Sequence, residues 1–279
     1  MQLRGRVGCT ACGAFTTDPW PSDDELERAY GSWYRPESGR FGGIGDALLR
    51  RTRGRLAHRL DQIAPSGAIL DVGSGDGALL DALASRGREA VGTERASRRE
   101  DVRAAEITEL DRSQSFAAVV FWHSLEHLRE PGAAIDRAVQ LLAPGGMLVV
   151  AVPNAASLQA RLFGDRWLAL DLPRHLVHLP LPTLAGRLRQ RGLRVERVSH
   201  LRGGQVLFGW LHGLVGSLPG RPDLYEAIRR SEARSRRLSP LMRLYSLAAG
   251  VVLLPVAFLG TVIEVAARRG GTVYVEARK

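Results

Sequence analysis

Short runs of apolar residues alternate with longer amphipathic segments along most of this 279-residue chain. A short uninterrupted apolar run is typical of a strand buried on both faces, and apolar side chains that recur every three or four positions are typical of a helix. A strand–turn–helix unit is predicted at residues 68–86, and further strands at residues 90–94, 102–105, 115–122, 147–152, 193–201 and 272–277. The other predicted helices lie at residues 47–60, 131–142 and 181–190. This alternation predicts an α/β fold, with a doubly wound, mostly parallel sheet.

The link between the second and third predicted strands is unusually short. Seven residues separate Glu94 from Val102. Parallel strands normally need a crossover of a dozen residues or more, so this link cannot hold a full helix. We expect either a simple turn here or a degenerate third strand.

A long insertion, residues 202–270, precedes the last strand and contains two uncharged segments, 205–218 and 244–263. The second has the length of a transmembrane helix, but a single crossing would put the strands on either side of it on opposite sides of the membrane. We therefore expect two helices that lie in the membrane interface, or dip in and return, with Pro255 kinking the longer one and the Arg-rich stretch 229–237 among head groups. The alternative is a helical lid or a dimer surface.

The composition limits the kinds of binding partner and the cellular compartment that we expect for this protein. The net charge is +10, but the arginines are scattered among acids and no basic stripe with interleaved aromatics occurs, which argues against nucleic acid as a partner. A basic chain also suits an anionic membrane surface. The two cysteines, Cys9 and Cys12, form one C-x-x-C, which is half of a four-ligand zinc ribbon, so we predict no metal site within this chain. Residues 1–20 lack the apolar segment of a signal peptide, which indicates a cytoplasmic protein.

The strongest chemical signal is a glycine turn after the first strand of the predicted sheet. Residues 69–77 read Ile-Leu-Asp-Val-Gly-Ser-Gly-Asp-Gly, and a helical pattern follows directly. Glycines at such a turn let a ligand approach bare backbone at the carboxyl edge of the sheet. Glu94 ends the second strand, where a carboxylate can accept hydrogen bonds from both ribose hydroxyls of a nucleoside. The spacing alone fits both a dinucleotide dehydrogenase and a methyl-donor site.

Several further motifs make the chain resemble class I S-adenosylmethionine (SAM)-dependent methyltransferases, in particular a bacterial subgroup with Glu-His after the fourth strand. The matching stretches are Asp71–Gly77, Glu94, Trp122-His-Ser-Leu-Glu-His127, Pro144-Gly-Gly146, Val152-Pro-Asn154 and Leu172-Pro-Arg-His-Leu-Val-His178. The resemblance covers roughly residues 60–200 and the last strand. It implies the Rossmann-like methyltransferase fold, with SAM as cofactor. It also implies that the N-terminal segment corresponds to part of a zinc ribbon.

The resemblance also implies roles for individual residues. The residues implied at the methionine and ribose end of SAM are Asp71, Gly73, Ser74, Gly75 and Gly77, with Glu94 on the ribose hydroxyls. Glu106 and Ile107 would be the neighbours of the adenine, and His123 lies where the sheet opens, in reach of SAM or substrate.

Three histidines are the candidate catalytic residues: His175, His123 and His178. His175 and His178 lie in a loop after the fifth strand, where acceptors enter, and a histidine with an ordinary pKa of about 6.5 suits removal of a hydroxyl proton. His178 is equally compatible with a structural role. His123-x-x-Glu126-His127 matches an inverted zinc-protease motif, but it follows a strand rather than lying on a helix. It also resembles a Glu-x-x-Glu-His metal site whose first ligand is here His123, and Mg²⁺ prefers oxygen ligands.

These observations predict a SAM-dependent methyltransferase that O-methylates a small amphipathic or lipid-linked acceptor by in-line transfer, in the cytoplasm or peripherally on the inner face of the membrane. The alternatives are an NAD-dependent oxidoreductase and a non-catalytic SAM-fold subunit that docks on an envelope-assembly partner. The predicted domains are an N-terminal cap (1–58), a SAM-binding core (59–201 with 271–279) and the apolar insertion (202–270).

Overall fold

A computed structural model describes residues 5–31, 41–95, 97, 99–201, 204–235 and 237–279. The chain forms two compact units. Unit 1 comprises Met1–Leu48, Pro153–Pro180 and His200–Thr272, and unit 2 comprises Leu49–Val152, Leu181–Ser199 and Val273–Lys279. Residues 153–180 thus group with the N-terminal segment and the insertion, whereas we expected them in the core.

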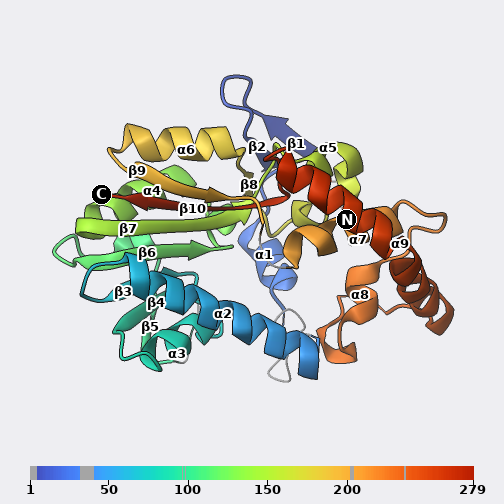
Figure 1. Cartoon of the computed structure of the whole chain (residues 1–279), viewed down its shortest axis with the longest axis horizontal. Helices are drawn as coiled ribbons and strands as arrows, with labels where there is room; N and C mark the ends of the chain where they lie inside the picture. The colour runs from blue at the N-terminus through green and yellow to red at the C-terminus, as the bar shows by residue number, and fades with distance from the viewer. Residues whose placement is uncertain (1–4, 32–40, 96, 98, 202–203, 236) are drawn as a thin grey trace. The chain divides into compact units, whose positions relative to one another are not determined.

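Unit 2 is built on a seven-stranded sheet with the order β5-β4-β3-β6-β7-β10-β9 (Figure 1). Its strands are β3 (Ile69–Val72), β4 (Ala90–Glu94), β5 (Val102–Ala104), β6 (Phe116–Trp122), β7 (Leu142–Pro153), β9 (Arg194–Ser199) and β10 (Thr272–Arg278). The strands from β5 to β7 pair in parallel, and β9 pairs antiparallel with β10. Lys279 N donates to Gly146 O and Asn154 N to Gly271 O, so β10 also runs antiparallel to β7. The predicted doubly wound, mostly parallel α/β fold is confirmed.

Two local features depart from the simple alternation. β5 is a true parallel strand of three residues, paired with β4 from Gly92–Val102 to Glu94–Ala104, although no α-helix lies in the described part of the link between them. β7 begins directly after the preceding helix: Leu142 pairs with Phe116, and Met147 pairs with Ala118. The four residues between Leu142 and Met147 therefore bulge, so Pro144-Gly-Gly interrupts the strand pairing rather than forming a separate loop.

The helices of unit 2 bury one apolar face against the sheet. They are α2 (Gly43–Ile63, whose first residues belong to unit 1), α3 (Ala78–Ala84), α4 (Pro131–Leu141) and α6 (Leu181–Gln190). One core cluster joins Leu60 of α2 and Leu83 of α3 to Val120 and Val149 of the central strands. Burial of each such side chain contributes about 1.5–3 kcal/mol. This packing holds the carboxyl ends of β3, β4 and β6 in fixed register.

Unit 1 contains a small antiparallel sheet of order β1-β2-β8, made of Gly5–Gly8, Phe15–Asp18 and Val177–His178. Cys9 and Cys12 lie exposed in the turn of the β1–β2 hairpin. Helix α1 (Asp23–Ala29) follows, with a capping box in which the Ser22 and Glu25 side chains each bond the other residue's backbone N–H. The pairing of β2 with β8 brings a segment near residue 16 beside one near residue 178.

The rest of unit 1 is helical: α5 (Leu158–Phe163), α7 (Gln205–Gly216), α8 (Leu224–Ile228) and α9 (Pro240–Ala266). α7 and α9 pack side by side (Figure 1). Between them lies Glu264, which is fully buried. Its carboxylate accepts hydrogen bonds from Gln159 N at 2.9 Å, Gln159 Nε2 at 2.7 Å and Trp210 Nε1 at 2.9 Å. This cluster ties α9 to α5 and α7.

Burial raises the pKa of Glu264 above its ordinary value, although the bonds from Gln159 and Trp210 act in the opposite direction. A raised pKa in the folded state means that ionisation costs more in the folded than in the unfolded chain. The stability of unit 1 should therefore decrease as the pH rises through the folded-state pKa of this group. We expect the melting temperature of the wild type, relative to that of Glu264→Gln, to increase as the pH is lowered from 7 to 5. A difference that does not change with pH would show that Glu264 does not titrate in this way.

Candidate active site

The glycine turn of unit 2 joins β3 to α3 in a left-handed conformation. Gly73, Gly75 and Gly77 have φ values of 75°, 64° and 76°, a region that other residues rarely adopt. The turn is fastened to the neighbouring strand β4, because Gly73 N and Ser74 N both donate to Thr93 O, at 2.8 and 3.0 Å. The sequence therefore places three glycines where the backbone requires them. The result is a rigid turn of bare backbone at the carboxyl edge of the sheet.

Glu94 faces this turn from the end of β4. Its Oε2 accepts a hydrogen bond from Gly75 N at 2.9 Å, and its Oε1 accepts one from Arg95 N at 3.0 Å. An ionised carboxylate has about four acceptor sites on its two oxygens, so Glu94 can also accept bonds from a ligand. The structure thus brings together Glu94 and the glycine turn, as the sequence indicated.

Ser124 is a site residue that the sequence reasoning did not single out. It follows the carboxyl end of β6, and a Cβ built on Gly73 would lie 2.5 Å from its Cβ. Its hydroxyl is buried and has no hydrogen-bond partner within the described residues. The position of Ser124 directly after a buried strand is the feature of the sequence that could have identified it as a site residue. Together with buried Asp71 and Ser74, it gives the turn a polar lining.

His123 also follows β6 and has a φ of 55°, which is uncommon for a residue other than glycine. Its Nδ1 lies 3.3 Å from Oε1 of Glu126, a buried carboxylate in the short 3₁₀ turn Leu125–His127. The His-x-x-Glu-His stretch is therefore not on an α-helix, and the geometry of an inverted zinc-protease motif is absent from this described stretch.

The predicted adenine neighbours follow β5. Glu106 caps the 3₁₀ turn Ile107–Glu109, and its backbone N–H donates to Glu109 Oε2 at 2.8 Å. The side chain of Ile107 is 1% exposed, so it packs in the core of unit 2. A contact between adenine and these two residues stays a prediction.

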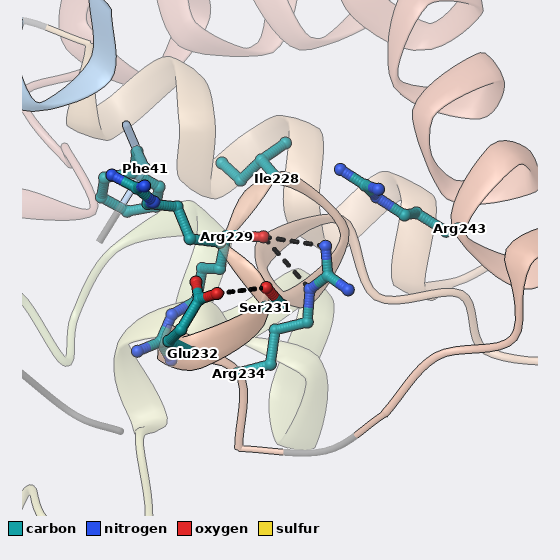
Figure 2. Close-up of a pocket in the computed structure, with 8 residues that line it drawn as sticks. Phe41, Ile228, Arg229, Ser231, Glu232, Arg234 and Arg243 are labelled. Carbon is teal, nitrogen blue, oxygen red and sulfur yellow. Dashed lines mark hydrogen bonds between the residues drawn. The ribbon is translucent and has the colours of Figure 1, made fainter. Parts of the chain in front are cut away.

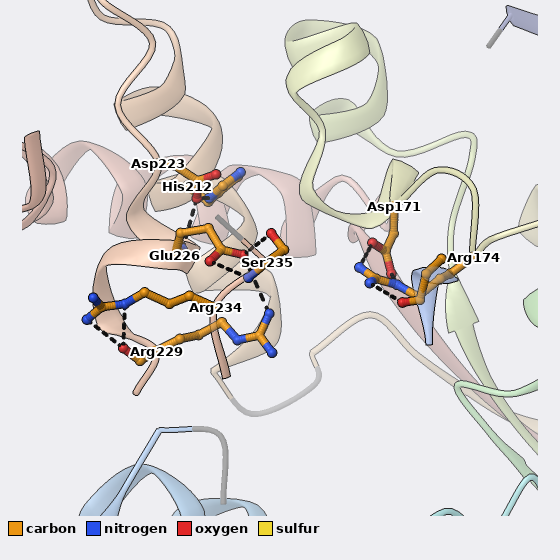
Figure 3. A network of polar contacts seen from close by, with 9 residues as sticks. Asp171, Arg174, His212, Asp223, Glu226, Arg229, Arg234 and Ser235 are labelled. Carbon is orange, nitrogen blue, oxygen red and sulfur yellow. Dashed lines mark hydrogen bonds and ion pairs between the residues drawn. The ribbon is translucent and has the colours of Figure 1, made fainter. Parts of the chain in front are cut away.

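His175 and His178 belong to unit 1: His175 lies in the loop that leads into β8, and His178 is the last residue of β8. Nδ1 of His175 donates to the carbonyl oxygen of Ala169 at 2.7 Å, and this assignment puts the proton of the neutral ring on Nδ1. Nε2 is then the basic nitrogen, and it lies 3.7 Å from Oδ2 of Asp171. Arg174 holds the same carboxylate with two hydrogen bonds (Figure 3). The loop therefore presents a histidine with a defined tautomer beside an anchored acid.

His178 lies in a more enclosed aromatic environment. Its ring is 2% exposed and stacks on Phe15, with ring centroids 4.3 Å apart and an angle of 18° between the planes. Trp167 lies 6.1 Å away on another side. These contacts give the ring a packing role between β2 and β8.

A glycine turn between a buried strand and a helix, faced by a strand-end carboxylate, defines an α/β enzyme with a nucleotide-type cofactor site. A family model described as "Methyltransferase domain" matches residues 47–198, more than half of the chain. The chain belongs to this methyltransferase family and is a SAM-dependent methyltransferase.

Individual relatives agree with the family match. The chain is 31% identical over 171 residues to a ubiquinone biosynthesis O-methyltransferase of Xylella fastidiosa (strain 9a5c). This alignment covers 53% of this chain and 70% of the relative. It is 30% identical over 168 residues to an enzyme of the same name from Xanthomonas campestris pv. campestris (strain B100), covering 50% and 70%. Among solved structures, that of the [4+2]-cyclase SpnF shares the fold, with a TM-score of 0.54, 18% identity and coverage of 93% of this chain and 97% of that chain.

The residues of unit 2 fit SAM as the cofactor. The turn offers bare backbone, Glu94 offers carboxylate oxygens for hydroxyl donors, and Ser124 offers a buried hydroxyl without a partner in the described chain. These groups match a ligand that carries both a ribose and an amino-acid end. The family match favours methyl transfer over the NAD-dependent and non-catalytic alternatives.

We expect Gly73→Ala to lower the free energy of unfolding by more than the left-handed φ alone accounts for. The φ costs about 1–2 kcal/mol for a residue with a Cβ, and overpacking against Ser124 adds about 1–3 kcal/mol. Gly87→Ala is the matched control, because Gly87 has a φ of 71° and no atom within 4 Å of a built Cβ. Urea unfolding of both variants measures the difference. Equal losses would show that Ser124 moves aside without cost.

Proposed function

We propose that this enzyme transfers a methyl group to the hydroxyl of a small amphipathic or lipid-linked acceptor. The observation that carries this proposal is the similarity to two enzymes named for O-methylation in ubiquinone biosynthesis, each matched over 70% of its length. A ubiquinone-type precursor is a hydroxylated ring with an apolar tail. An acceptor of that class also suits the exposed apolar surface of unit 1 described below.

In this proposal, unit 2 holds the cofactor. Glu94 accepts hydrogen bonds from the ribose hydroxyls, and the glycine turn lies against the methionine and ribose end. The other proposed contacts are Asp71, Ser74 and His123, with Glu106 and Ile107 near the adenine. The support is the carboxylate of Glu94 beside the turn and the polar lining from Asp71, Ser74 and Ser124.

Bound SAM supplies an electrophilic methyl group on a sulfonium. The chain's own contribution is to position the acceptor and remove its proton. Nε2 of His175 takes the hydroxyl proton of the acceptor, and bound SAM would supply the methyl group to that oxygen and keep the electron pair of its carbon–sulfur bond. Asp171, 3.7 Å from Nε2, then stabilises the imidazolium. We assign His123 to orientation of the substrate or cofactor and His178 to packing.

Helix α9 provides the second part of the proposal, attachment to a membrane surface. It is 27 residues long with a mean hydropathy of 2.3 in its most apolar window, a third of which is buried. The exposed large apolar and aromatic side chains cover a broad face of the helix: Leu241, Leu244, Tyr245, Val251, Val252, Leu254, Val256, Phe258, Leu259, Val262 and Ile263. The opposite face carries Glu264 and packs on α7. A helix with one face on protein and one apolar face exposed suits a position in the membrane interface, with the protein on the cytoplasmic side.

His175→Gln tests the general base. We expect turnover with a labelled SAM and a lipid extract to fall about 100-fold or more, while the affinity for S-adenosylhomocysteine in calorimetry is unchanged. His58→Gln, an exposed histidine on α2, is the control. An unchanged rate would remove His175 from the mechanism, and absence of S-adenosylhomocysteine binding by the wild type would overturn the cofactor assignment.

A double variant, Val252→Glu with Leu259→Glu, tests the membrane surface. The two residues are 74% and 59% exposed, so the change should leave the melting temperature nearly unaffected. We expect binding to anionic vesicles in a flotation assay to be lost, because two carboxylates would enter the interface. Arg112→Gln with Ser113→Glu, on an exposed turn of unit 2, changes the net charge by the same amount and is the control. Equal vesicle binding by the variant and the wild type would refute the membrane role of α9.

A further inference from the structure

Unit 1 contains an open cavity of about 350 Å³ that is rich in arginine (Figure 2). It is lined by Phe41, Ile228, Arg229, Arg230, Arg234 and Arg243. Ser231 and Glu232 complete the wall, and they hydrogen-bond to each other at 2.8 Å. Four arginines and one acidic residue thus contribute to the lining. Nothing in the proposed methyl transfer uses this cavity.

Two of the arginines are held in place by backbone carbonyls rather than by acids. Nε and Nη2 of Arg234 donate to the carbonyl oxygen of Arg229, at 3.1 and 3.0 Å (Figure 2). Nε of Arg243 donates to the carbonyl oxygen of Ala227 at 3.0 Å. Within the described residues, neither guanidinium has a carboxylate within 4.0 Å. Each is therefore oriented, keeps its positive charge, and has N–H groups left for a ligand.

Arg229 differs from Arg234 and Arg243 because its side chain is buried in the wall of the cavity. Its side chain is 1% exposed, lies 3.5 Å from Oε1 of Glu226, and sits over the ring of Tyr225 at 5.0 Å. Glu226 is held in turn by the backbone N–H and the hydroxyl of Ser235, at 3.0 and 2.7 Å (Figure 3). This network fixes the carbonyl to which Arg234 is bound. The arrangement of the cavity wall therefore rests on a buried ion pair whose carboxylate is hydrogen-bonded to Ser235.

We propose that this cavity binds a phosphate or diphosphate group, with Arg234 and Arg243 as its principal ligands. Arginine binds phosphate oxygens through paired N–H donors, and the N–H groups of Arg234 and Arg243 that do not bond backbone carbonyls remain for such a ligand. The group belongs either to a lipid head group or to a soluble phosphorylated molecule. This inference does not depend on methyl transfer.

Calorimetric titration of the full chain with inorganic pyrophosphate tests the site. We expect saturable binding by the wild type and a loss of affinity of about tenfold or more in Arg234→Gln with Arg243→Gln. Arg28→Gln with Arg112→Gln removes the same charge at two exposed positions elsewhere and should keep the wild-type affinity. Unchanged melting temperatures show that both variants are folded. No binding by the wild type, or equal losses in both double variants, would overturn the proposal.

Vesicle flotation distinguishes the two sources of the phosphate. If the ligand is a lipid head group, vesicles with phosphatidic acid in phosphatidylcholine should bind the wild type, pyrophosphate should compete, and the Arg234/Arg243 variant should bind less. If the ligand is soluble, that variant should lose pyrophosphate binding but float with the vesicles as the wild type does. Both results support the phosphate site and assign its source. Because S-adenosylhomocysteine binding is measured separately, failure here leaves the methyltransferase assignment intact.

Discussion

The close approach of three chain segments at the carboxyl ends of β3, β4 and β6 is the constraint on which the cofactor site depends. A Cβ on Gly73 would meet Ser124 at 2.5 Å, and a Cβ on Gly92 would meet Ser74 Oγ at 2.5 Å. The turn can therefore lie flat against both neighbouring strands only with glycine at these positions. That packing lets Thr93 accept two backbone N–H groups and sets Glu94 opposite Gly75. Interior packing of this density leaves little freedom for the turn to move.

Much of unit 2 could be predicted from the sequence, because its strands are buried on both faces and read as uninterrupted apolar runs. The glycine turn and Glu94 were equally visible, since the left-handed backbone and the strand-end acid leave a local signature. The bulge after Leu142 could not be predicted, because it depends on which residue of β6 pairs with Leu142. Nor could β5 be assigned firmly, since three residues carry too little periodicity and the pairing with β4 decides it.

Unit 1 was harder to predict because its contacts join distant parts of the sequence. The pairing of β2 with β8 and the stacking of Phe15 on His178 connect residues far apart in the chain. The apolar segment 244–263 could be recognised in the sequence, but which face of the helix would be buried could not be predicted from it. An apolar helix has no preferred buried face by composition alone, whereas Glu264 must face its donors on Gln159 and Trp210. One polar residue therefore determines which stripe of α9 is exposed. The arginine cavity was also hidden, because it depends on carbonyls that only tertiary structure orients.

The shortness of β5 has a consequence for the behaviour of the sheet toward other chains. β5 and β9 are the two outer strands of the sheet, and an outer strand offers unpaired N–H and C=O groups to any strand of another molecule. β5 offers only three residues for such pairing, and β9 carries Arg194, Glu196 and Arg197, all of which are exposed. The short β5 at one edge of the sheet and the charged β9 at the other edge both disfavour the addition of a strand from another molecule. The short strand that follows the link from β4, which contains no α-helix in its described part, thus limits strand addition at the β5 edge of the sheet.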